Sequence, residues 1–288
     1  MAKVLVTGAT GFLGRALVPA LTLAGHDVIA LRRSDGDVTQ AATWARLPAV
    51  EHVFHLAGRS FVPESWHDPA GFLHANVSGT AQGLAYSRAC GAHFVFVSGY
   101  LYGRPKRLPI QEDDPQEPNN PYALSKSLAE QICAFYATSM GLSATVIRPF
   151  NIYGPGQRPE FLIPTIVDQV AKGADIQVND LEPRRDYVHL DDLAAALVRT
   201  IERPGGGHRV FNIGSGRSYS VRDIIDAIQA AAGTQLPVVS SEQPRSNEIA
   251  DVRADITRAR TMLGWEPRYS FADGIARLVR AAGDDKRQ

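Results

Sequence analysis

The fold is decided by residues 4–14, which read Val4-Leu5-Val6-Thr7-Gly8-Ala9-Thr10-Gly11-Phe12-Leu13-Gly14. A short β-branched run ends at Thr7, and a helical pattern begins near Leu13. Between them, Gly8 permits a tight turn, Gly11 lets the backbone approach a pyrophosphate, and Gly14 lets the helix pack closely on the strand. Because a helix N-terminus attracts phosphate charge, this unit predicts dinucleotide binding. The expected cofactor contacts within it are Gly8, Thr10, Gly11, Phe12, Leu13 and Gly14.

Short β-branched runs and longer helical patterns alternate through the first half of the chain. Strands are expected at residues 4–7, 27–31, 53–56, 94–98 and 143–148, and helices at 13–23, 77–89 and 122–140. This alternation predicts an α/β fold of Rossmann type, in which a doubly wound parallel sheet carries helices on both faces. Only 19 residues lie between Arg33 and Val53, so the usual third strand is expected to be short or missing.

The pattern changes after Pro149, where Gly and Pro punctuate shorter helices. These helices are expected at residues 163–172, 190–201, 221–232 and 256–263. We therefore expect residues 1–150 to form the NADP-binding domain with the catalytic residues. Residues 151–288 are expected to form mainly a smaller substrate-binding lobe, partly threaded back onto the sheet, and residues 284–288 a solvated end.

Composition excludes several classes of partner. The chain has 288 residues, with 30 Lys and Arg against 30 Asp and Glu, so there is no electrostatic argument for binding nucleic acid or an anionic membrane. No run of about 18 apolar residues predicts a membrane span. The two cysteines, Cys90 and Cys133, lack metal-ligand spacing, which favours free thiols, a cytoplasmic protein and no metal site.

Two arginines follow the second expected strand. Arg32 and Arg33 stand where a carboxylate usually binds the ribose hydroxyls of NAD. The planar guanidinium fork suits a 2′-phosphate, which favours NADP(H), with NAD(H) as the alternative cofactor. The alternative interpretation is that Arg32 and Arg33 are solvated surface residues without a ligand. Asp37 follows closely and is expected to contact the ribose or the adenine.

A tyrosine and a lysine four residues apart suggest catalysis. Tyr122 and Lys126 lie on one face of the expected helix, which starts after Asn119-Asn120-Pro121. An ammonium beside a phenol favours the phenolate, so the pKa of Tyr122 is expected to be lowered. Ser98 ends a strand at the sheet edge where ligands bind, and its hydroxyl is placed to hold a substrate oxygen while Tyr122 exchanges the proton. Ser98, Tyr122 and Lys126 are the expected catalytic residues.

At this point the chain resembles the extended short-chain dehydrogenases/reductases of the NAD(P)-dependent nucleotide-sugar epimerase/dehydratase superfamily. The resemblance covers nearly the full length, through residues 7–14, 55–58, 76–80, 98 with 102–103, 122–126, 148–156, 185–192 and 263–267. It implies hydride transfer between nicotinamide and a sugar carbon, a nucleotide-diphosphate sugar substrate and a homodimer. The further cofactor-binding residues on this basis are Leu56, Ala57, Gly58, Asn76, Val97, Tyr122, Lys126 and Pro149.

Departures from the family pattern narrow the expected reaction. The dehydratases resemble one another in carrying acids directly after the catalytic hydroxyl, where this chain has Gly99-Tyr100-Leu101, so dehydration is disfavoured. Arg32 replaces the aspartate of the UDP-galactose 4-epimerase pattern. Residues 154–164, 179–186 and 244–248 are similar to those of GDP-4-keto-6-deoxymannose reductases.

The expected function is therefore NADPH-dependent reduction of the 4-keto group of a nucleotide-diphospho-4-keto-6-deoxyhexose. The GDP-linked mannose derivative is the first choice and a dTDP-linked sugar the next. One alternative is an NAD-dependent nucleotide-sugar 4-epimerase of the UDP-glucose/galactose type. An alternative of another class is a non-catalytic NADP-binding regulator, which would not need the tyrosine and lysine pair.

Several further side chains have two readings. Arg185 and Arg245 are apt for a diphosphate, or they pair with a carboxylate instead. Leu162 and Val178 wall the nucleotide base or pack in the core. The full set of expected substrate contacts is Ser98, Tyr100, Asn151, Leu162, Val178, Arg185 and Arg245.

Four other features are expected to be structural or open. His55 and His189 are expected to be structural, and residues 112–114 to form a solvated loop. An apolar stripe faces either the sheet or a partner. It consists of Leu124, Leu128, Ile132 and Phe135.

Overall fold

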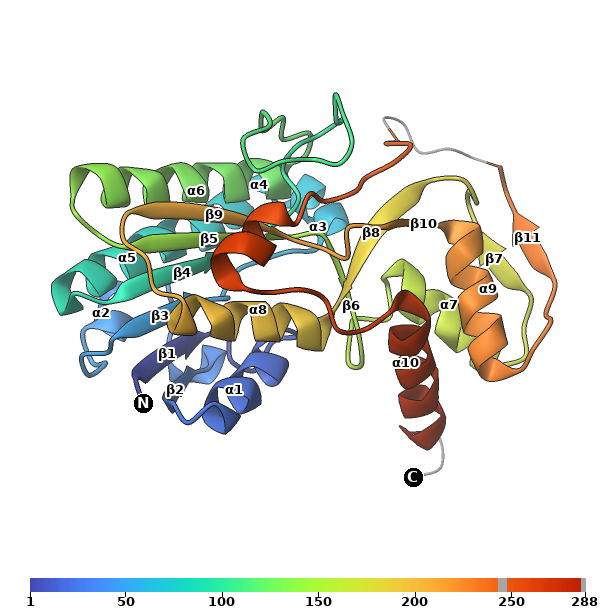
Figure 1. Ribbon diagram of the computed structural model, residues 1–288, viewed down its shortest axis with the longest axis horizontal. Coiled ribbons are helices and arrows are strands. Elements are labelled where there is room, and N and C mark those ends of the chain that lie inside the picture. Colours follow the sequence, from blue (N-terminus) through green and yellow to red (C-terminus); the bar gives the residue numbers. More distant parts are fainter. Residues whose placement is uncertain (243–247, 286–288) are drawn as a thin grey trace.

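The computed structural model describes residues 1–242 and 248–285 and has two lobes, with the larger on the left of Figure 1. A six-stranded sheet of order β2-β1-β3-β4-β5-β9 forms the centre of the larger lobe. Its strands are β1 (Lys3–Thr7), β2 (Asp27–Leu31), β3 (His52–His55), β4 (His93–Val97), β5 (Ala144–Pro149) and β9 (His208–Ile213). Every neighbouring pair is parallel, so the predicted fold class is confirmed.

The strand order indicates where ligands are expected to bind. The order reverses between β1 and β3, and in open parallel sheets the crevice for ligands lies at this point, outside the carboxyl ends of the strands. β2 is the edge strand of the sheet. In the part of the chain that the structure describes, no further strand pairs with its outer side.

Apolar residues alternate along the strands to cover both faces of the sheet. One face, through Val4, Val6 and Phe54, belongs to a cluster with residues of α1 (Gly14–Leu23) and α8 (Leu190–Glu202). The other face, through Leu5 and Val53, packs with residues of α5 (Gly79–Cys90) and α6 (Pro121–Ser139). Burial on both faces explains why the strands read as nearly continuous apolar runs.

Short helices complete the larger lobe. They are η1 (Arg33–Asp35), α2 (Ala41–Trp44), α3 (Val62–His67), α4 (Pro69–Leu73), the π-helix η2 (His74–Ser78) and the π-helix η3 (Ala259–Leu263). Strand β9 comes from the second half of the chain and pairs with β5, and α8 packs against α1. The C-terminal half thus contributes elements to both lobes.

The smaller lobe has its own core. A three-stranded sheet of order β10-β8-β6 and a two-stranded sheet of order β11-β7 lie with three helices. The elements are β6 (Asn151–Tyr153), α7 (Leu162–Ala171), β7 (Ile176–Val178), β8 (Arg184–His189), β10 (Ser218–Ser220), α9 (Val221–Ala232), β11 (Val238–Ser240) and α10 (Phe271–Asp285). Ile163, Ile166, Ile225 and Ile275 are buried in this core.

Helix α10 is absent from the sequence-based expectation. Helix α10 continues to Asp285, and residues 286–288 of the end that is predicted to be solvated lie outside the described residues. Ser270 accepts a hydrogen bond from the Asp273 backbone N–H at 3.1 Å, and Phe271, Ile275 and Leu278 are buried at helical spacing. This cap and periodicity were the available signal. Within the part of the chain that the structure describes, no helix is long and apolar enough to cross a membrane.

Candidate active site

The turn between β1 and α1 requires glycine. Gly8 has a φ of 68°, and a Cβ built on it would lie 2.9 Å from the Ala57 nitrogen. The Gly11 N–H donates to the Gly8 carbonyl at 2.9 Å, and a Cβ on Gly14 would collide with that same carbonyl oxygen. The turn therefore forms a bare backbone cradle at the carboxyl ends of β1 and β3, which fits the predicted dinucleotide phosphates.

Asn76 joins the segment after β3 to α6. Its side chain accepts from the Arg59 N–H at 2.8 Å and donates to the Arg59 carbonyl at 3.0 Å and to Ser125 Oγ at 2.8 Å. A Cβ on Gly58 would lie 2.6 Å from Asn76 Oδ1. Asn76 lies in the π-helix η2, a local distortion that often marks functional sites.

Lys126 is buried at the centre of this arrangement. Its ammonium donates to the Val97 carbonyl at 2.8 Å and lies 4.6 Å from the centre of the Phe96 ring. The residue is only 6% exposed, and burial lowers the pKa of Lys126 to about 8. Lys126 is therefore a cation at neutral pH that loses its proton in mild alkali.

Tyr122 and Ser98 lie at the same end of β4. The Asn120 side chain caps α6 by accepting from the Ala123 N–H at 2.9 Å, which sets Tyr122 in the first turn of the helix. A Cβ built on Gly99 would lie 2.6 Å from the Tyr122 hydroxyl. Ser98 Oγ is buried and has no hydrogen-bond partner among residues 1–242 and 248–285. The Tyr122 hydroxyl and the Ser98 hydroxyl therefore both lie near the end of β4.

The pKa of Tyr122 differs from the expectation. Burial, with a further contribution from the Glu130 carboxylate, raises the pKa of Tyr122 to about 12. The predicted lowering is wrong, because burial disfavours the charged phenolate. The phenol is therefore protonated at neutral pH and suited to donate a proton.

A buried ion pair beneath the site was not predicted. Glu130 lies on α6 one turn beyond Lys126, and Arg148 on β5 donates to its carboxylate at 2.6 Å. Arg148 also donates to the Tyr102 hydroxyl at 2.8 Å and to the Glu112 carbonyl at 2.9 Å. The pair thus holds α6 to the sheet and to the loop before it. The arginine inside an apolar strand was the available sequence signal.

Glu112 corrects another expectation. The loop at residues 112–114 is predicted to be solvated, but Glu112 is buried. Its carboxylate accepts from the Asn212 N–H at 2.9 Å, and burial raises its pKa. The carboxylate therefore serves to join this loop to β9.

Arg32 and Arg33 are exposed after the edge strand β2. The Arg32 backbone N–H donates to Asp35 Oδ2 at 2.8 Å, and the Ala9 N–H donates to the Leu31 carbonyl at 3.4 Å. The end of β2 therefore lies beside the glycine turn. Asp37 is exposed, and its pKa is lowered by a hydrogen bond from the Thr39 N–H.

The other expected cofactor residues lie at or near the carboxyl ends of the same strands. Leu13, Val97 and Pro149 are buried, Phe12, Leu56 and Ala57 are half-buried, and Thr10 is exposed.

Five of the seven expected substrate residues contact other parts of the protein. Arg185 forms an ion pair with Glu248 and donates to the Ile249 carbonyl at 2.6 Å. Asn151 donates to the Asp186 carbonyl at 3.1 Å, and the Tyr100 hydroxyl to the Gly103 carbonyl at 2.6 Å. Leu162 and Val178 pack against the core of the smaller lobe. Arg245 lies outside the described residues.

The two histidines are structural, as expected. His55 is fully buried, with Nδ1 3.0 Å from Thr7 Oγ1, and burial lowers its pKa to about 3. His189 caps α8 by accepting from the Asp191 N–H at 3.2 Å.

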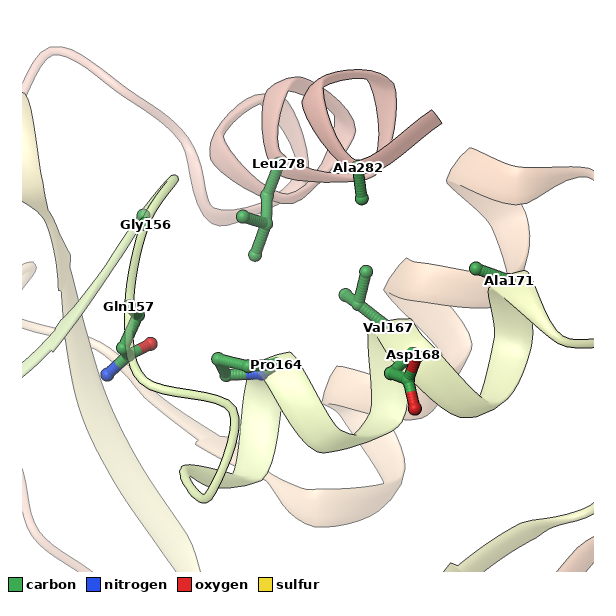
Figure 2. A pocket seen from close by; sticks show the side chains of 9 residues that line it. Gly156, Gln157, Pro164, Val167, Asp168, Ala171, Leu278 and Ala282 are labelled. Carbon is green, nitrogen blue, oxygen red and sulfur yellow. The ribbon is translucent and has the colours of Figure 1, made fainter. Parts of the chain in front are cut away.

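Side chains from the two lobes meet beside the crevice. Arg158 Nη2 donates to Glu64 Oε1 at 3.0 Å, and the rings of Phe61 and Phe161 meet edge-on with centroids 5.5 Å apart. A cavity of about 170 Å³ lies elsewhere, between α7, α10 and the loop at Gly156, and none of the predicted catalytic residues lines it (Figure 2).

Residues 4–214 match the model of the NAD dependent epimerase/dehydratase family. The chain belongs to this family. A UDP-glucose 4-epimerase from Mycolicibacterium smegmatis is 33% identical over 306 residues, covering 96% of this chain and 97% of that protein. A GDP-6-deoxy-D-mannose reductase from Pseudomonas aeruginosa is 32% identical over 300 residues, covering 96% of each. The solved structure of RMD from Pseudomonas aeruginosa complexed with NADPH has a TM-score of 0.91 and 28% identity, and the match covers 99% of this chain and 100% of that one.

Membership of the epimerase/dehydratase family confirms the resemblance drawn from the motifs. The chain is an NAD(P)-dependent enzyme. A reductase and an epimerase are almost equally similar to it, so the reaction must be inferred from its own residues.

Proposed function

We propose that this family member reduces the 4-keto group of a nucleotide-diphospho-4-keto-6-deoxyhexose with NADPH. GDP-4-keto-6-deoxymannose is the first-choice substrate, and a dTDP-linked sugar is the next. The observation that carries the proposal is the exposed pair Arg32 and Arg33, which follows β2 beside the glycine turn. A cationic pair there favours a 2′-phosphate and thus NADPH, the cofactor of net reductions.

The residues present fit this cofactor. Gly8 and Gly14 provide the cradle for the pyrophosphate at the start of α1, and Arg32 and Arg33 provide charge for the 2′-phosphate. When bound, the nicotinamide supplies a hydride. Lys126, one turn beyond Tyr122 on α6 and held by the Val97 carbonyl, is proposed to bind the nicotinamide ribose and the phenol.

The mechanism assigns one role to each catalytic residue. Ser98 Oγ donates to the C4 carbonyl oxygen and orients it. The Tyr122 hydroxyl gives its proton to the developing alkoxide, and the Lys126 ammonium stabilises the phenolate that remains. Arg185, Arg245 and Asn151 are proposed to bind the diphosphate, with Tyr100, Leu162 and Val178 around the sugar and the base. Arg185 then exchanges Glu248 for phosphate oxygens.

Replacing Arg32 and Arg33 together by alanine tests the cofactor assignment. We expect the KM for NADPH to rise about tenfold or more, because a charge-assisted contact is lost, while the KM for NADH changes by less than about twofold. Initial rates with both cofactors measure this. Arg88→Ala, at an exposed position on α5, is the control. An equal change for NADPH and NADH would contradict the assignment.

The second candidate is an NAD-dependent nucleotide-sugar 4-epimerase, which the similarity to the Mycolicibacterium smegmatis enzyme favours. Absorbance assays with NADPH and NADH against GDP-, dTDP- and UDP-linked 4-keto-6-deoxysugars separate the two. Cofactor oxidation with a keto-sugar supports reduction. Interconversion of UDP-hexoses without oxidation of NADPH or NADH would make the epimerase the preferred function. A non-catalytic regulator would give neither reaction.

We further propose that the enzyme is a homodimer formed through α6. Leu124 and Phe135 on this helix are 43% and 54% exposed, whereas Ile132 packs against the core beneath. Phe135→Glu is expected to convert a dimer into the 31.2 kDa monomer, because a charge cannot be buried there unpaired. Light scattering after size exclusion measures the mass, with Val239→Glu, at another exposed apolar residue, as the control. A dimer that persists in Phe135→Glu would contradict this interface.

We propose that the enzyme acts in the cytoplasm. Cys90 and Cys133 are both free, as expected for a reducing compartment.

A further inference from the structure

The segment between β6 and α7 belongs to the smaller lobe but contacts the larger lobe at two places. Residues 154–161, which contain neither helix nor strand, are called the strap below. The Arg15 guanidinium on α1 donates to the Gly156 carbonyl of the strap at 3.4 Å. Arg158 Nη2 of the strap donates to Glu64 Oε1 on α3 at 3.0 Å. The strap therefore joins the helix that follows β1 to the helix that follows β3.

These two contacts lie on opposite sides of the crevice proposed to bind the dinucleotide. The strand order reverses between β1 and β3, so the crevice lies outside the carboxyl ends of these two strands. Helix α1 covers one face of the sheet, and α3 contacts α6, which covers the other face. The glycine turn proposed to hold the pyrophosphate comes directly before Arg15. A segment that reaches from α1 to α3 therefore crosses the mouth of this crevice.

Aromatic contacts add to the ion pair on the α3 side. The Arg158 guanidinium lies 4.6 Å from the centre of the Phe61 ring, a distance that allows a cation–π interaction. The same ring meets the Phe161 ring of the strap edge-on, with centroids 5.5 Å apart. Arg158 thus contacts both a carboxylate and an aromatic ring of the larger lobe, which makes it the centre of this attachment.

The attachment is weak enough to be released. Within residues 1–242 and 248–285, no backbone–backbone hydrogen bond joins the strap to the larger lobe. The side chains of Arg158 and Glu64 are 48% and 43% exposed, and ion pairs at such exposure contribute little stability. On the other side of the strap, Gly156 and Gln157 line the cavity of about 170 Å³ that α7 and α10 also line (Figure 2). The strap therefore has space into which it can withdraw from α1.

We propose that the strap is a gate over the cofactor crevice, locked to the larger lobe by Arg158. It opens to admit or release the dinucleotide and closes to keep water out. The protein makes all of the locking contacts with itself, so they hold the strap closed with or without cofactor. The consequence for turnover rests on the proposed function: a reductase exchanges its cofactor in every cycle, so the strap must open once for each sugar reduced.

Arg158→Ala tests the gate by stopped-flow fluorescence with NADPH and without any sugar. We expect the association and dissociation rate constants to rise about 3- to 10-fold each, because the lost contacts favour the open state both with and without cofactor. The Kd, which is the ratio of the two constants, should change by less than about twofold.

A second variant tests the same contact from the larger lobe. Glu64→Gln should raise both rate constants about two- to fivefold. Added to Arg158→Ala, it should change them by less than about twofold, because its partner is already absent. Arg199→Ala, which removes an exposed ion pair with Glu202 on α8, is the matched control and should keep both wild-type constants.

The two rate constants distinguish a gate from a direct cofactor contact. A rise in the dissociation rate constant alone, with a matching rise in Kd, would make Arg158 a cofactor ligand and overturn the gate. Unchanged rate constants in Arg158→Ala would overturn it as well. Because no sugar is present, the result does not depend on the reaction. A protein that reduces no keto-sugar but shows both increases loses the proposed function and keeps the gate.

Discussion

Tyr122→Phe is expected to lower kcat by about 10²- to 10⁴-fold, the usual contribution of a positioned general acid. The loss should fall on kcat, and the Kd for NADPH should change by less than about twofold, because the ring remains and only the hydroxyl is removed. The raised pKa of Tyr122, about 12, keeps the phenol protonated through the neutral range. Single-turnover absorbance decay of NADPH measures the chemical step directly.

The control for this prediction is Tyr136→Phe, a second half-buried tyrosine on α6. It should keep wild-type kcat, since Tyr136 lies far along the helix from Ser98. A Tyr122→Phe enzyme with nearly full turnover would remove Tyr122 from the chemistry and leave the proton donor unassigned.

Lys126→Met is expected to reduce activity and to stabilise the fold. We expect kcat to fall about 10²- to 10³-fold, as when one electrostatic stabiliser is lost. Burial lowers the pKa of Lys126 from 10.5 to about 8, so the buried ammonium costs folding free energy at neutral pH. Removing it should raise the free energy of unfolding by about 1 to 3 kcal/mol, after allowance for the lost bond to the Val97 carbonyl.

The sign of the pH dependence follows from linkage. Between pH 8 and 10.5 the unfolded chain binds the lysine proton more strongly than the folded chain, so wild-type stability rises with pH across this interval. The advantage of Lys126→Met is therefore largest below pH 8 and disappears toward pH 10.5. Urea unfolding at a series of pH values measures it.

Lys106→Met is the control, because Lys106 is exposed and should change stability by less than about 0.5 kcal/mol. A Lys126→Met protein that is less stable than the wild type at pH 7 would contradict the cost assigned to this buried cation. In the wild type, kcat/KM should also decline as pH rises through about 8, where Lys126 loses its charge.

Local patterns predicted the elements that build the site. The glycine turn after β1 was predicted because Gly8 and Gly14 are needed where backbone meets backbone, and the structure has this contact. Two rules predicted Ser98, Tyr122 and Lys126. Ser98 was chosen because it ends a strand, and Tyr122 and Lys126 because a spacing of four places them on one helix face. Both rules depend on residues close in sequence, and the catalytic roles of the three residues stay a prediction.

Long-range contacts account for what was not predicted. Glu112 is buried because Asn212, 100 residues away, donates to it, and the Glu130–Arg148 pair joins a helix to a strand. The raised pKa of Tyr122 depends on burial, which spacing along a helix does not report. Arg185 pairs with Glu248, 63 residues away. The sequence therefore indicated that a carboxylate was one possible partner but did not identify which one.

The most direct test of the proposed reduction is the number of NADPH molecules oxidised for each nucleotide sugar converted, followed over many turnovers with GDP-4-keto-6-deoxymannose. Absorbance gives the cofactor, and chromatography gives the sugar product. A reductase releases its oxidised cofactor after every cycle, so we expect about one NADPH for each sugar. Conversion of nucleotide sugar with no net oxidation of NADPH would contradict reduction and identify an enzyme that returns the hydride to its own substrate.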